Sequence, residues 1–227
     1  MQNPAGFIDH TLLSPVTSEA RIVVLCEEAV EAGFATVCVP PVFVPLAAAE
    51  LYGSDVKVCS VVGFPCGYNR ARQKVQEALD LVSVGAEELD MVVHLGSLLQ
   101  KNFLQVEDEI AQVVLAVGRI PVKVIIECCY LDPELMRQAT DSVCRAGAAC
   151  VKTSTGFGSG GATLDDVALL VDAAAGRIGV KAAGGIRTLA DCRAFIAAGA
   201  TRIGTSSGVA IINEWNVLEK GCGHDDI

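Results

Sequence analysis

Two lysines stand in the stretches of this 227-residue chain that are best suited to covalent chemistry. Lys152 lies in the apolar stretch Val151–Gly156, and Lys181 lies in Val180–Gly185. A single lysine at the end of a strand is most often a solvated charge. Two lysines on neighbouring strands are different, because such strands lie about 4.8 Å apart and would bring the ammonium groups close together.

Repulsion between two buried ammonium groups favours the loss of one proton. At about 5 Å and an effective dielectric constant near 20, this repulsion is roughly 3 kcal/mol, or about two pKa units. Together with desolvation, it would lower the pKa of a lysine from about 10.4 towards about 7 or 8. A neutral amine attacks a carbonyl carbon, so the pattern predicts a Schiff base on Lys152.

Asp90 is a carboxylate inside the apolar stretch Glu88–Val93, where we expect it to close a strand. A buried carboxylate needs a partner, and the lysine pair would supply one. Its role is a structural ion pair, a proton relay or both. Lys123 opens its own stretch, Lys123–Glu127, so we expect it to be a structural residue at the opposite end of the strands.

Two glycine-rich segments are typical of phosphate binding. Gly184–Arg187 follows one candidate strand and Gly204–Gly208, which contains Ser206 and Ser207, follows the next. Glycines allow close approach of the backbone, and N–H groups at the start of a following helix bind anions. A further segment, Ser154–Gly156, could add donors, including those of Thr155 and Gly156. The alternative is that these segments are plain turns.

Eight short apolar runs alternate with longer segments of helical period. The expected strands are Phe7–His10, Thr36–Val39, Lys57–Val62, Glu88–Val93, Lys123–Glu127, Ala149–Thr153, Ile178–Ala183 and Arg202–Thr205. The expected helices include Ser18–Ala32, Arg70–Val84, Ser97–Val117, Pro133–Arg145, Thr163–Ala175 and Leu189–Ala198.

Gly33, Gly85, Gly147 and Gly199 each separate a helical segment from the next strand, as C-capping glycines do. They mark a repeat of about 30 residues, one strand and one helix per period. A doubly wound open sheet would more often have fewer strands and a glycine-rich loop after the first strand. We therefore predict an α/β fold, a (β/α)8 TIM barrel that occupies residues 1–227 as a single domain, with its active site at the carboxyl ends of the strands.

The composition excludes several classes of protein. A net charge of −10 argues against a nucleic-acid partner but permits a small phosphorylated ligand. Ten cysteines are present without a secretory signal or a C-x-x-C pair, and the three histidines are isolated, so we expect reduced thiols, a cytoplasmic location and no metal site. No apolar run is long enough to span a membrane.

Several motifs together resemble the deoxyribose-phosphate aldolase family, over about residues 7 to 210. They are Ile8–Leu13, Gly63–Pro65, Glu88–Val92, Val151–Phe157 and Lys181–Arg187. The resemblance implies a class I aldolase without a cofactor that reversibly converts 2-deoxy-D-ribose 5-phosphate into acetaldehyde and D-glyceraldehyde 3-phosphate.

The same resemblance implies the site residues. Lys152 would be the nucleophile, with Lys181 and Asp90 in a proton relay. The substrate end of the pocket would be lined by Asp9, Thr11 and Cys38, and the phosphate would bind at Gly184, Gly185, Gly204, Ser206 and Ser207. We expect a homodimer or a higher homo-oligomer.

Some positions differ from the commoner residues of the family. These are Val39–Pro41, Cys66 and His94–Gly96, and they leave the shape of the substrate pocket open. Some members use a tyrosine in the C-terminal tail for proton transfer, whereas Gly221–Ile227 contains none.

Two other functions remain open from the sequence. A sugar-phosphate isomerase would account for the phosphate loops but not for two buried lysines. A sugar-phosphate-binding protein without activity would gain nothing from a lysine of lowered pKa. Reduction with borohydride in the presence of substrate distinguishes them, because only a Schiff-base enzyme is trapped covalently.

Overall fold

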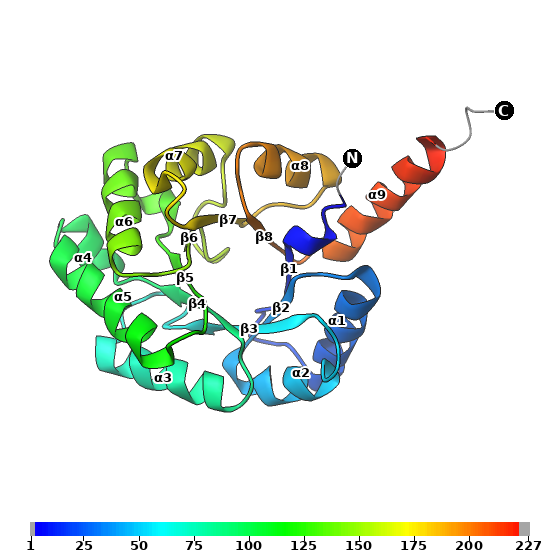
Figure 1. Cartoon of the computed structure of the whole chain (residues 1–227), viewed down its shortest axis with the longest axis horizontal. Helices are drawn as coiled ribbons and strands as arrows, with labels where there is room; N and C mark the ends of the chain where they lie inside the picture. Colours follow the sequence, from blue (N-terminus) through cyan, green and yellow to red (C-terminus); the bar gives the residue numbers. More distant parts are fainter. Residues whose placement is uncertain (1–2, 223–227) are drawn as a thin grey trace.

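The computed structural model describes residues 3–222 and forms a closed barrel of eight parallel strands, paired in sequence order with β1 against β8 (Figure 1). The predicted (β/α)8 barrel is therefore confirmed. The strands are β1 (Ile8–Thr11), β2 (Thr36–Val39), β3 (Lys57–Val62), β4 (Glu88–Val92), β5 (Val122–Ile125), β6 (Cys150–Lys152), β7 (Gly179–Ala183) and β8 (Arg202–Thr205).

Helices surround the barrel on its outer side (Figure 1). They are α1 (Glu19–Ala32), α2 (Val44–Glu50), α3 (Ala71–Ser83), α4 (Leu95–Leu99), α5 (Phe103–Val117), α6 (Pro133–Arg145), α7 (Leu164–Ala174), α8 (Leu189–Ala197) and α9 (Gly208–Cys222). Three single-turn 3₁₀ segments accompany them, namely η1 (Ala5–Phe7), η2 (Pro41–Phe43) and η3 (Cys128–Tyr130).

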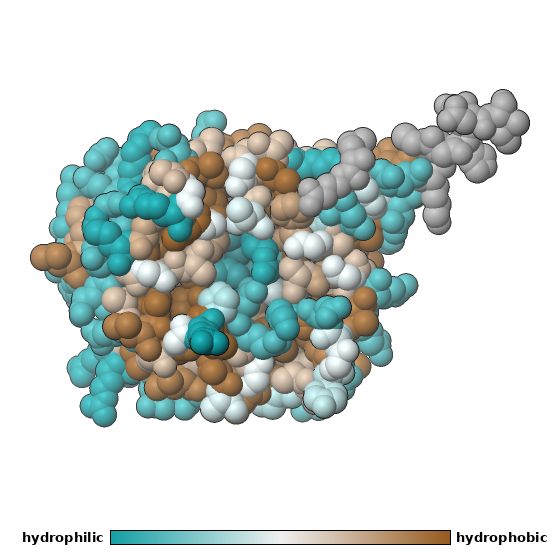
Figure 2. All heavy atoms as spheres, viewed as in Figure 1, coloured by the Kyte–Doolittle hydropathy of each residue, from teal (hydrophilic) through white to brown (hydrophobic). Residues whose placement is uncertain are grey.

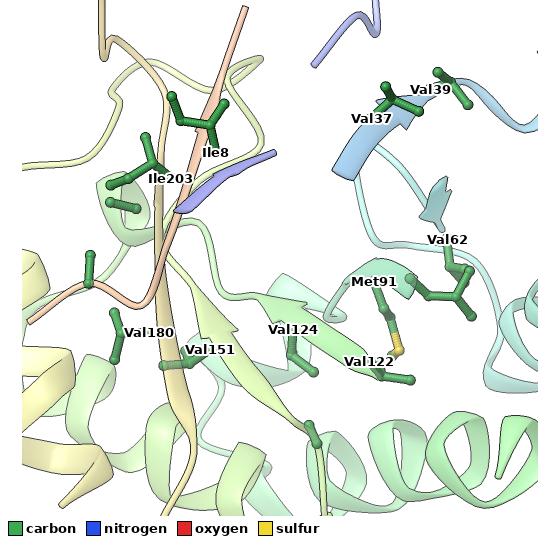
Figure 3. Packing of buried hydrophobic residues seen from close by; sticks show 14 of the residues in the cluster. Ile8, Val37, Val39, Val62, Met91, Val122, Val124, Val151, Val180 and Ile203 are labelled. Atoms are coloured by element: carbon green, nitrogen blue, oxygen red, sulfur yellow. The ribbon is translucent and has the colours of Figure 1, made fainter. Parts of the chain in front are cut away.

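Alternation along each strand separates an apolar outer layer from a charged interior, because successive side chains point to opposite faces of a sheet. Val151 of β6 and Val180 of β7 belong to the core cluster between strands and helices (Figure 3). Their neighbours Lys152 and Lys181 face the barrel axis, where both contact Asp90. The apolar residues of the strands thus anchor the barrel to its helices and leave the interior free for charged groups.

The predicted strands agree with the observed ones to within two residues at each end. The position expected for Asp90 along its strand is wrong. Asp90 and Lys181 each occupy the middle position of a five-residue strand, β4 and β7, and Asp90 does not close its strand. Asp90 nevertheless reaches Lys152 at the end of β6, because strands in a closed barrel are tilted and staggered, and Lys181 is the register partner of Lys152.

The predicted helix Ser97–Val117 is in fact two helices, α4 and α5. The chain turns between them at Lys101, whose φ is +58°, and Asn102 caps α5 by accepting a hydrogen bond from the backbone N–H of Gln105. Periodicity alone did not reveal this break, because apolar residues continue on both sides of it. The short helix α2 and the final helix α9 were not predicted.

The glycines predicted to cap helices have left-handed backbones, with φ of +69° at Gly33 and +79° at Gly147. At Gly33 the backbone N–H also bonds back to the last turn of α1. A side chain would strain such a position, so each glycine ends its helix and returns the chain to the barrel.

Within residues 3–222, none of the helices combines the length and apolar character that a membrane span requires. The structure describes the side chains of nine cysteines, and none of these nine forms a disulfide.

Candidate active site

The alternation of β6 and β7 places Lys152 and Lys181 side by side inside the barrel. They are register partners, and each Nζ lies 2.7 Å from the same atom, Oδ2 of Asp90. The two Nζ atoms are therefore no more than about 5.4 Å apart. Lys152 is 3% exposed and Lys181 is fully buried, so neither lysine is a solvated charge.

Asp90 also pairs with a third ammonium group, that of Lys123, which the sequence did not assign to the site. Lys123 Nζ lies 2.8 Å from Oδ1 of Asp90 and 2.7 Å from a carboxylate oxygen of Glu88. Lys123 was expected to be structural and distant from the other two lysines, but its register partner on β4 is Asp90 itself. The signal that could have revealed this contact was strand alternation, which turns Lys123 inward.

Asp9 on β1 completes the buried network. It pairs with Lys181 and with Arg202 of β8, and its Oδ2 lies 3.6 Å from Lys123 Nζ. Arg202 also pairs with Glu88 at 2.8 Å. Asp9 therefore holds Lys181 in place from below. The resemblance implied that Asp9 lines the substrate end of the pocket. This expectation is wrong, because Asp9 is fully buried and does not line the cavity.

The charges in this network determine the protonation of its members. Burial acts to raise the pKa of Asp90, but Lys123, Lys152 and Lys181 outweigh it and hold that pKa well below the usual range. Burial acts to lower the pKa of Lys181, but Asp9 and Asp90 raise it overall. Lys181 thus remains a cation beside Lys152, as the repulsion argument requires.

The network contains one more cation than carboxylate. Its members are the carboxylates Asp9, Glu88 and Asp90 and the cations Lys123, Lys152, Lys181 and Arg202. A buried excess charge is costly, so loss of one proton would balance the network. Lys152 pairs with only one carboxylate, whereas each of the other cations pairs with at least two. Lys152 is thus the cation with the fewest ion-pair partners in the network.

A cavity of about 520 Å³ opens above Lys152 at the carboxyl ends of the strands. Figure 2 shows hydrophilic residues gathered near the middle of the face that looks down the barrel. Eight of the predicted site residues line this cavity, namely Thr11, Lys152, Thr155, Gly156, Gly184, Gly185, Gly204 and Ser206.

The loops after β7 and β8 form one wall of the cavity. Gly184 and Gly185 have φ of +92° and +84°, a conformation that few other residues adopt. The Thr205 hydroxyl donates to the carbonyl of Ile186 at 2.6 Å and joins the two loops. Arg187 also lines this wall and is exposed, so the wall offers a cation besides its backbone N–H groups. Ser207 lies outside this cavity and lines a neighbouring one of about 450 Å³.

Cys38 lies below the cavity and does not line it, contrary to the expectation. It is fully buried on β2 beside its register partner Cys59 of β3. Their sulfur atoms and a carboxylate oxygen of Asp90 lie within 4.8 Å of one another, a grouping that metal ions can bind and that the sequence did not predict. However, three ammonium groups already contact the Asp90 carboxylate and would repel a cation there.

The positions that differ from the commoner family residues lie at the margin of the site. His94 caps α4 by accepting a hydrogen bond from the backbone N–H of Ser97 at 3.1 Å, and Cys66 is exposed. None of the segments Val39–Pro41, Cys66 and His94–Gly96 lines the cavity. The final residues of the tail without tyrosine, 223–227, lie outside the described residues.

Comparison with known proteins agrees with this geometry. The profile of the DeoC/LacD family of aldolases matches residues 6–214. The chain is 51% identical over 220 residues to the deoxyribose-phosphate aldolase of Deinococcus radiodurans, covering 97% of this chain and 99% of the relative. It is also 51% identical to the enzyme of the same name from a Thermoanaerobacter species, with 96% and 99% covered.

Among solved structures, the fold is similar to that of a tetrameric deoxyribose phosphate aldolase from Aeropyrum pernix. The TM-score is 0.88 at 38% sequence identity, and the match covers 95% of this chain and 92% of the other.

Proposed function

The chain belongs to the DeoC/LacD family of aldolases, and from this premise we propose that it is a class I aldolase acting on 2-deoxy-D-ribose 5-phosphate in deoxyribose phosphate catabolism. The products are acetaldehyde and D-glyceraldehyde 3-phosphate, and the reaction is reversible. The names of relatives that are about half identical over nearly their whole length support this choice of substrate.

One observation carries the proposal, namely the pairing of Lys152. It lies on the cavity wall, contacts a single carboxylate and belongs to a buried network with one surplus positive charge. Release of its proton balances the network and provides a neutral amine that faces the substrate. The imine then serves as the electron sink for bond cleavage.

The steps follow from this arrangement. Lys152 Nζ attacks C1 of the open-chain aldehyde, and loss of water gives the protonated imine. A base removes the proton from the C3 hydroxyl, the C2–C3 bond breaks, and its electron pair moves into the imine to form an enamine. Glyceraldehyde 3-phosphate leaves, the enamine takes up a proton at C2, and hydrolysis releases acetaldehyde and the free lysine.

Asp90 and Lys181 act as the proton relay in this proposal. Asp90 Oδ2 lies 2.7 Å from both lysine Nζ atoms, so it can pass a proton between them without any displacement of the chain. Asp9 supports the relay from below, since it pairs with Lys181 on the side away from the cavity. We assign Asp9 and Cys38 to the support of the site, and Thr11 to substrate contact.

The substrate phosphate is assigned to the wall formed by the loops after β7 and β8. Gly184, Gly185, Gly204 and Ser206 line the cavity there. Arg187 lines the same wall, so an anion is attracted locally although the chain carries a net charge of −10. Ser207 is assigned a supporting role, as its N–H donates to the Thr205 hydroxyl at 2.9 Å.

The wider setting is also part of the proposal. We propose that residues 1–227 act as one domain, without a metal or an organic cofactor, in a homo-oligomer in the cytoplasm. The tetrameric state stated for the Aeropyrum pernix relative supports the oligomer, and the nine unpaired cysteines of the described residues support a reducing compartment.

Borohydride trapping tests the proposal. Reduction of the protein with deoxyribose 5-phosphate should give a stable secondary amine, and peptide mapping should place it on Lys152 within Val151–Gly156. An adduct on Lys181 would reverse the roles of the two lysines. Absence of any adduct would leave an isomerase or a binding protein as the explanation for the phosphate loops.

A further inference from the structure

Glu127 is a buried carboxylate that the reaction steps above do not use. It follows β5 and precedes η3, and it is only 2% exposed. Its φ of +52° places it in the left-handed region, which is disfavoured for a residue with a side chain. A disfavoured backbone and a buried acid at one position indicate a specific task.

The hydrogen bonds of the Glu127 carboxylate all come from Thr155, a residue of the next loop. The backbone N–H of Thr155 donates to both carboxylate oxygens at 3.2 Å, and the Thr155 hydroxyl donates to Oε2 at 2.5 Å. Among the side chains that the structure describes, no cation forms an ion pair with Glu127. An acid buried without a cation costs stability, so the stability of the fold does not account for it.

The loop between β6 and α7 is fitted closely against Glu127. The Thr155 hydroxyl accepts a hydrogen bond from the backbone N–H of Phe157 at 3.0 Å, which fixes the turn at Gly156. A Cβ atom at Gly158 would lie 3.1 Å from both the Glu127 carboxyl carbon and the Cys129 sulfur. A side chain at position 158 would therefore require Glu127 or Cys129 to shift by a few tenths of an ångström, and glycine leaves this close fit undisturbed.

This loop is a wall of the cavity that contains Lys152. Thr155, Gly156 and Phe157 all line it, and the same loop bonds to the loop after β7 through the N–H of Ala162 and the carbonyl of Gly184. The N–H and hydroxyl of Thr155 both donate to Glu127, so these two donors are not available to a ligand. Gly156, which is exposed and has φ of +85°, is therefore the residue that this turn presents to the substrate.

We propose that Glu127 is a positioning residue of the aldolase, which acts through Thr155 to fix the turn at Gly156 against the bound sugar phosphate. The proposal rests on the function proposed above. It assigns Thr155 to the support of this turn, and it separates the placement of the substrate from the reactivity of Lys152, since Glu127 makes no contact with the buried ion-pair network.

The test replaces Glu127 by alanine and by glutamine. In Glu127→Ala, KM for deoxyribose 5-phosphate should rise at least about tenfold, because hydrogen bonds to a buried charge are lost, while kcat changes by less than about threefold. Glu127→Gln should lie between this variant and the wild type, since its amide oxygen still accepts from the Thr155 N–H. Glu134→Gln is the matched control, an exposed glutamate on α6 that should leave both constants unchanged.

Trapping with acetaldehyde separates this proposal from the proposed function. Imine formation on Lys152 with this small aldehyde should be unchanged in both Glu127 variants. Absence of trapping in the wild type would overturn the aldolase itself, whereas a wild-type KM in both Glu127 variants would overturn only the role of Glu127. If the folded Glu127→Gln variant combined a raised KM with a lowered kcat and weaker acetaldehyde trapping, Glu127 would have a general structural role instead.

Thr155→Val provides a second route that does not depend on folding of the alanine variant. This change removes the hydroxyl that joins Glu127 to Phe157. If Glu127 acts through Thr155, the variant that carries both Glu127→Gln and Thr155→Val should have a KM close to that of the worse single variant. If the increases in KM of the two single variants multiply in the double variant, the two residues act independently and the proposal is overturned.

Discussion

At the scale of single residues, Lys152 differs from its neighbours in the number of carboxylates that hold its charge. Lys181 contacts Asp9 and Asp90, and Lys123 contacts these two and Glu88, but Lys152 contacts Asp90 alone. A lysine with several carboxylate partners retains its proton. The reactivity proposed for Lys152 therefore depends on the whole network, in which Lys152 has fewer carboxylate partners than any other cation.

Lys181→Met tests this dependence directly. The change preserves much of the side-chain volume and removes the positive charge next to Lys152, which also strengthens the pairing of Lys152 with Asp90. The midpoint of imine formation with a simple aldehyde, measured by borohydride trapping against pH, should move upward by about one to two pH units with a similar plateau. Turnover is not a suitable measurement, because Lys181 also belongs to the proton relay.

Lys57→Met is the matched control, since Lys57 is an exposed lysine at the start of β3 that pairs with Glu87. Its midpoint should equal that of the wild type. An unmoved midpoint in Lys181→Met would mean that desolvation alone controls Lys152, and Lys181 would then be only a proton relay.

Removal of metal ions is a second test at this scale. The group formed by Cys38, Cys59 and Asp90 has the spacing of a metal site, but ammonium groups surround its carboxylate. The imine itself accepts the electron pair, so a divalent ion has no task in the proposed reaction. Prolonged treatment with EDTA should leave the rate of glyceraldehyde 3-phosphate release unchanged. A loss of this rate that zinc restores would contradict the proposed mechanism.

At the scale of elements, each wall of the cavity comes from a loop at the carboxyl end of a strand. The loops after β7 and β8 are joined through Thr205, and the loop after β6 is held by Glu127 from the loop after β5. Strands and helices fix the ends of these loops, and hydrogen bonds between neighbouring loops fix their tips. This division explains how the barrel presents glycine-rich segments in a defined arrangement.

Ser206→Asp tests the loop after β8. A carboxylate at this exposed position on the cavity wall should repel the phosphate of the substrate. We expect the KM for deoxyribose 5-phosphate to rise at least about tenfold, which corresponds to about 1.4 kcal/mol, and the KM for unphosphorylated deoxyribose to change much less. Steady-state kinetics with both substrates measure the difference.

Ser18→Asp serves as the control, because Ser18 is exposed and precedes α1, where an acidic residue is well tolerated. This variant adds the same charge outside the cavity. Equal increases in KM for both substrates in Ser206→Asp would show that the loop supports the fold and does not bind the phosphate.

At the scale of the whole molecule, the buried network couples activity to stability. Asp9 and Asp90 have pKa values below their usual range, because the neighbouring ammonium and guanidinium groups outweigh the effect of burial. Their contribution to stability is present above the unfolded pKa of about 3.9 and is lost as the pH falls towards the folded values. Lys123 and Lys181 have raised pKa values, so their contribution is present below about pH 10.4 and is lost as the pH rises further.

The contribution of Asp9 and Asp90 to the free energy of unfolding should therefore be nearly constant above about pH 5 and fall below it. Urea unfolding at a series of pH values measures it. Asp141→Asn is the control, because Asp141 is an exposed carboxylate that pairs with Arg145 and Arg177 at the surface. This variant should change the fall in unfolding free energy at low pH only slightly. A steady decline in stability from pH 8 to pH 5 would show that the buried acids do not retain their charge.

The sequence by itself determined the barrel and the three residues at its centre. Strands and helices alternate with a regular period, and the four glycines predicted to cap helices, which follow α1, α3, α6 and α8, all have positive φ. Lys152, Lys181 and Asp90 were identifiable because each is a charged residue inside an apolar run. A charge in such a run must be paired in the folded protein, so its presence in the sequence is already informative.

Only the tertiary structure decided which other residues join them. The staggered strands of the closed barrel bring Asp9 into contact with Lys123 and Arg202. Periodicity predicts which face of the sheet a side chain lies on, but not its position along the barrel axis. Glu127 and Thr155 lie 28 positions apart and meet through the placement of two loops, which no local pattern encodes. Alternation and burial are short-range properties that a sequence displays directly, whereas pairing across the barrel depends on closure, which exists only once all eight strands are in place.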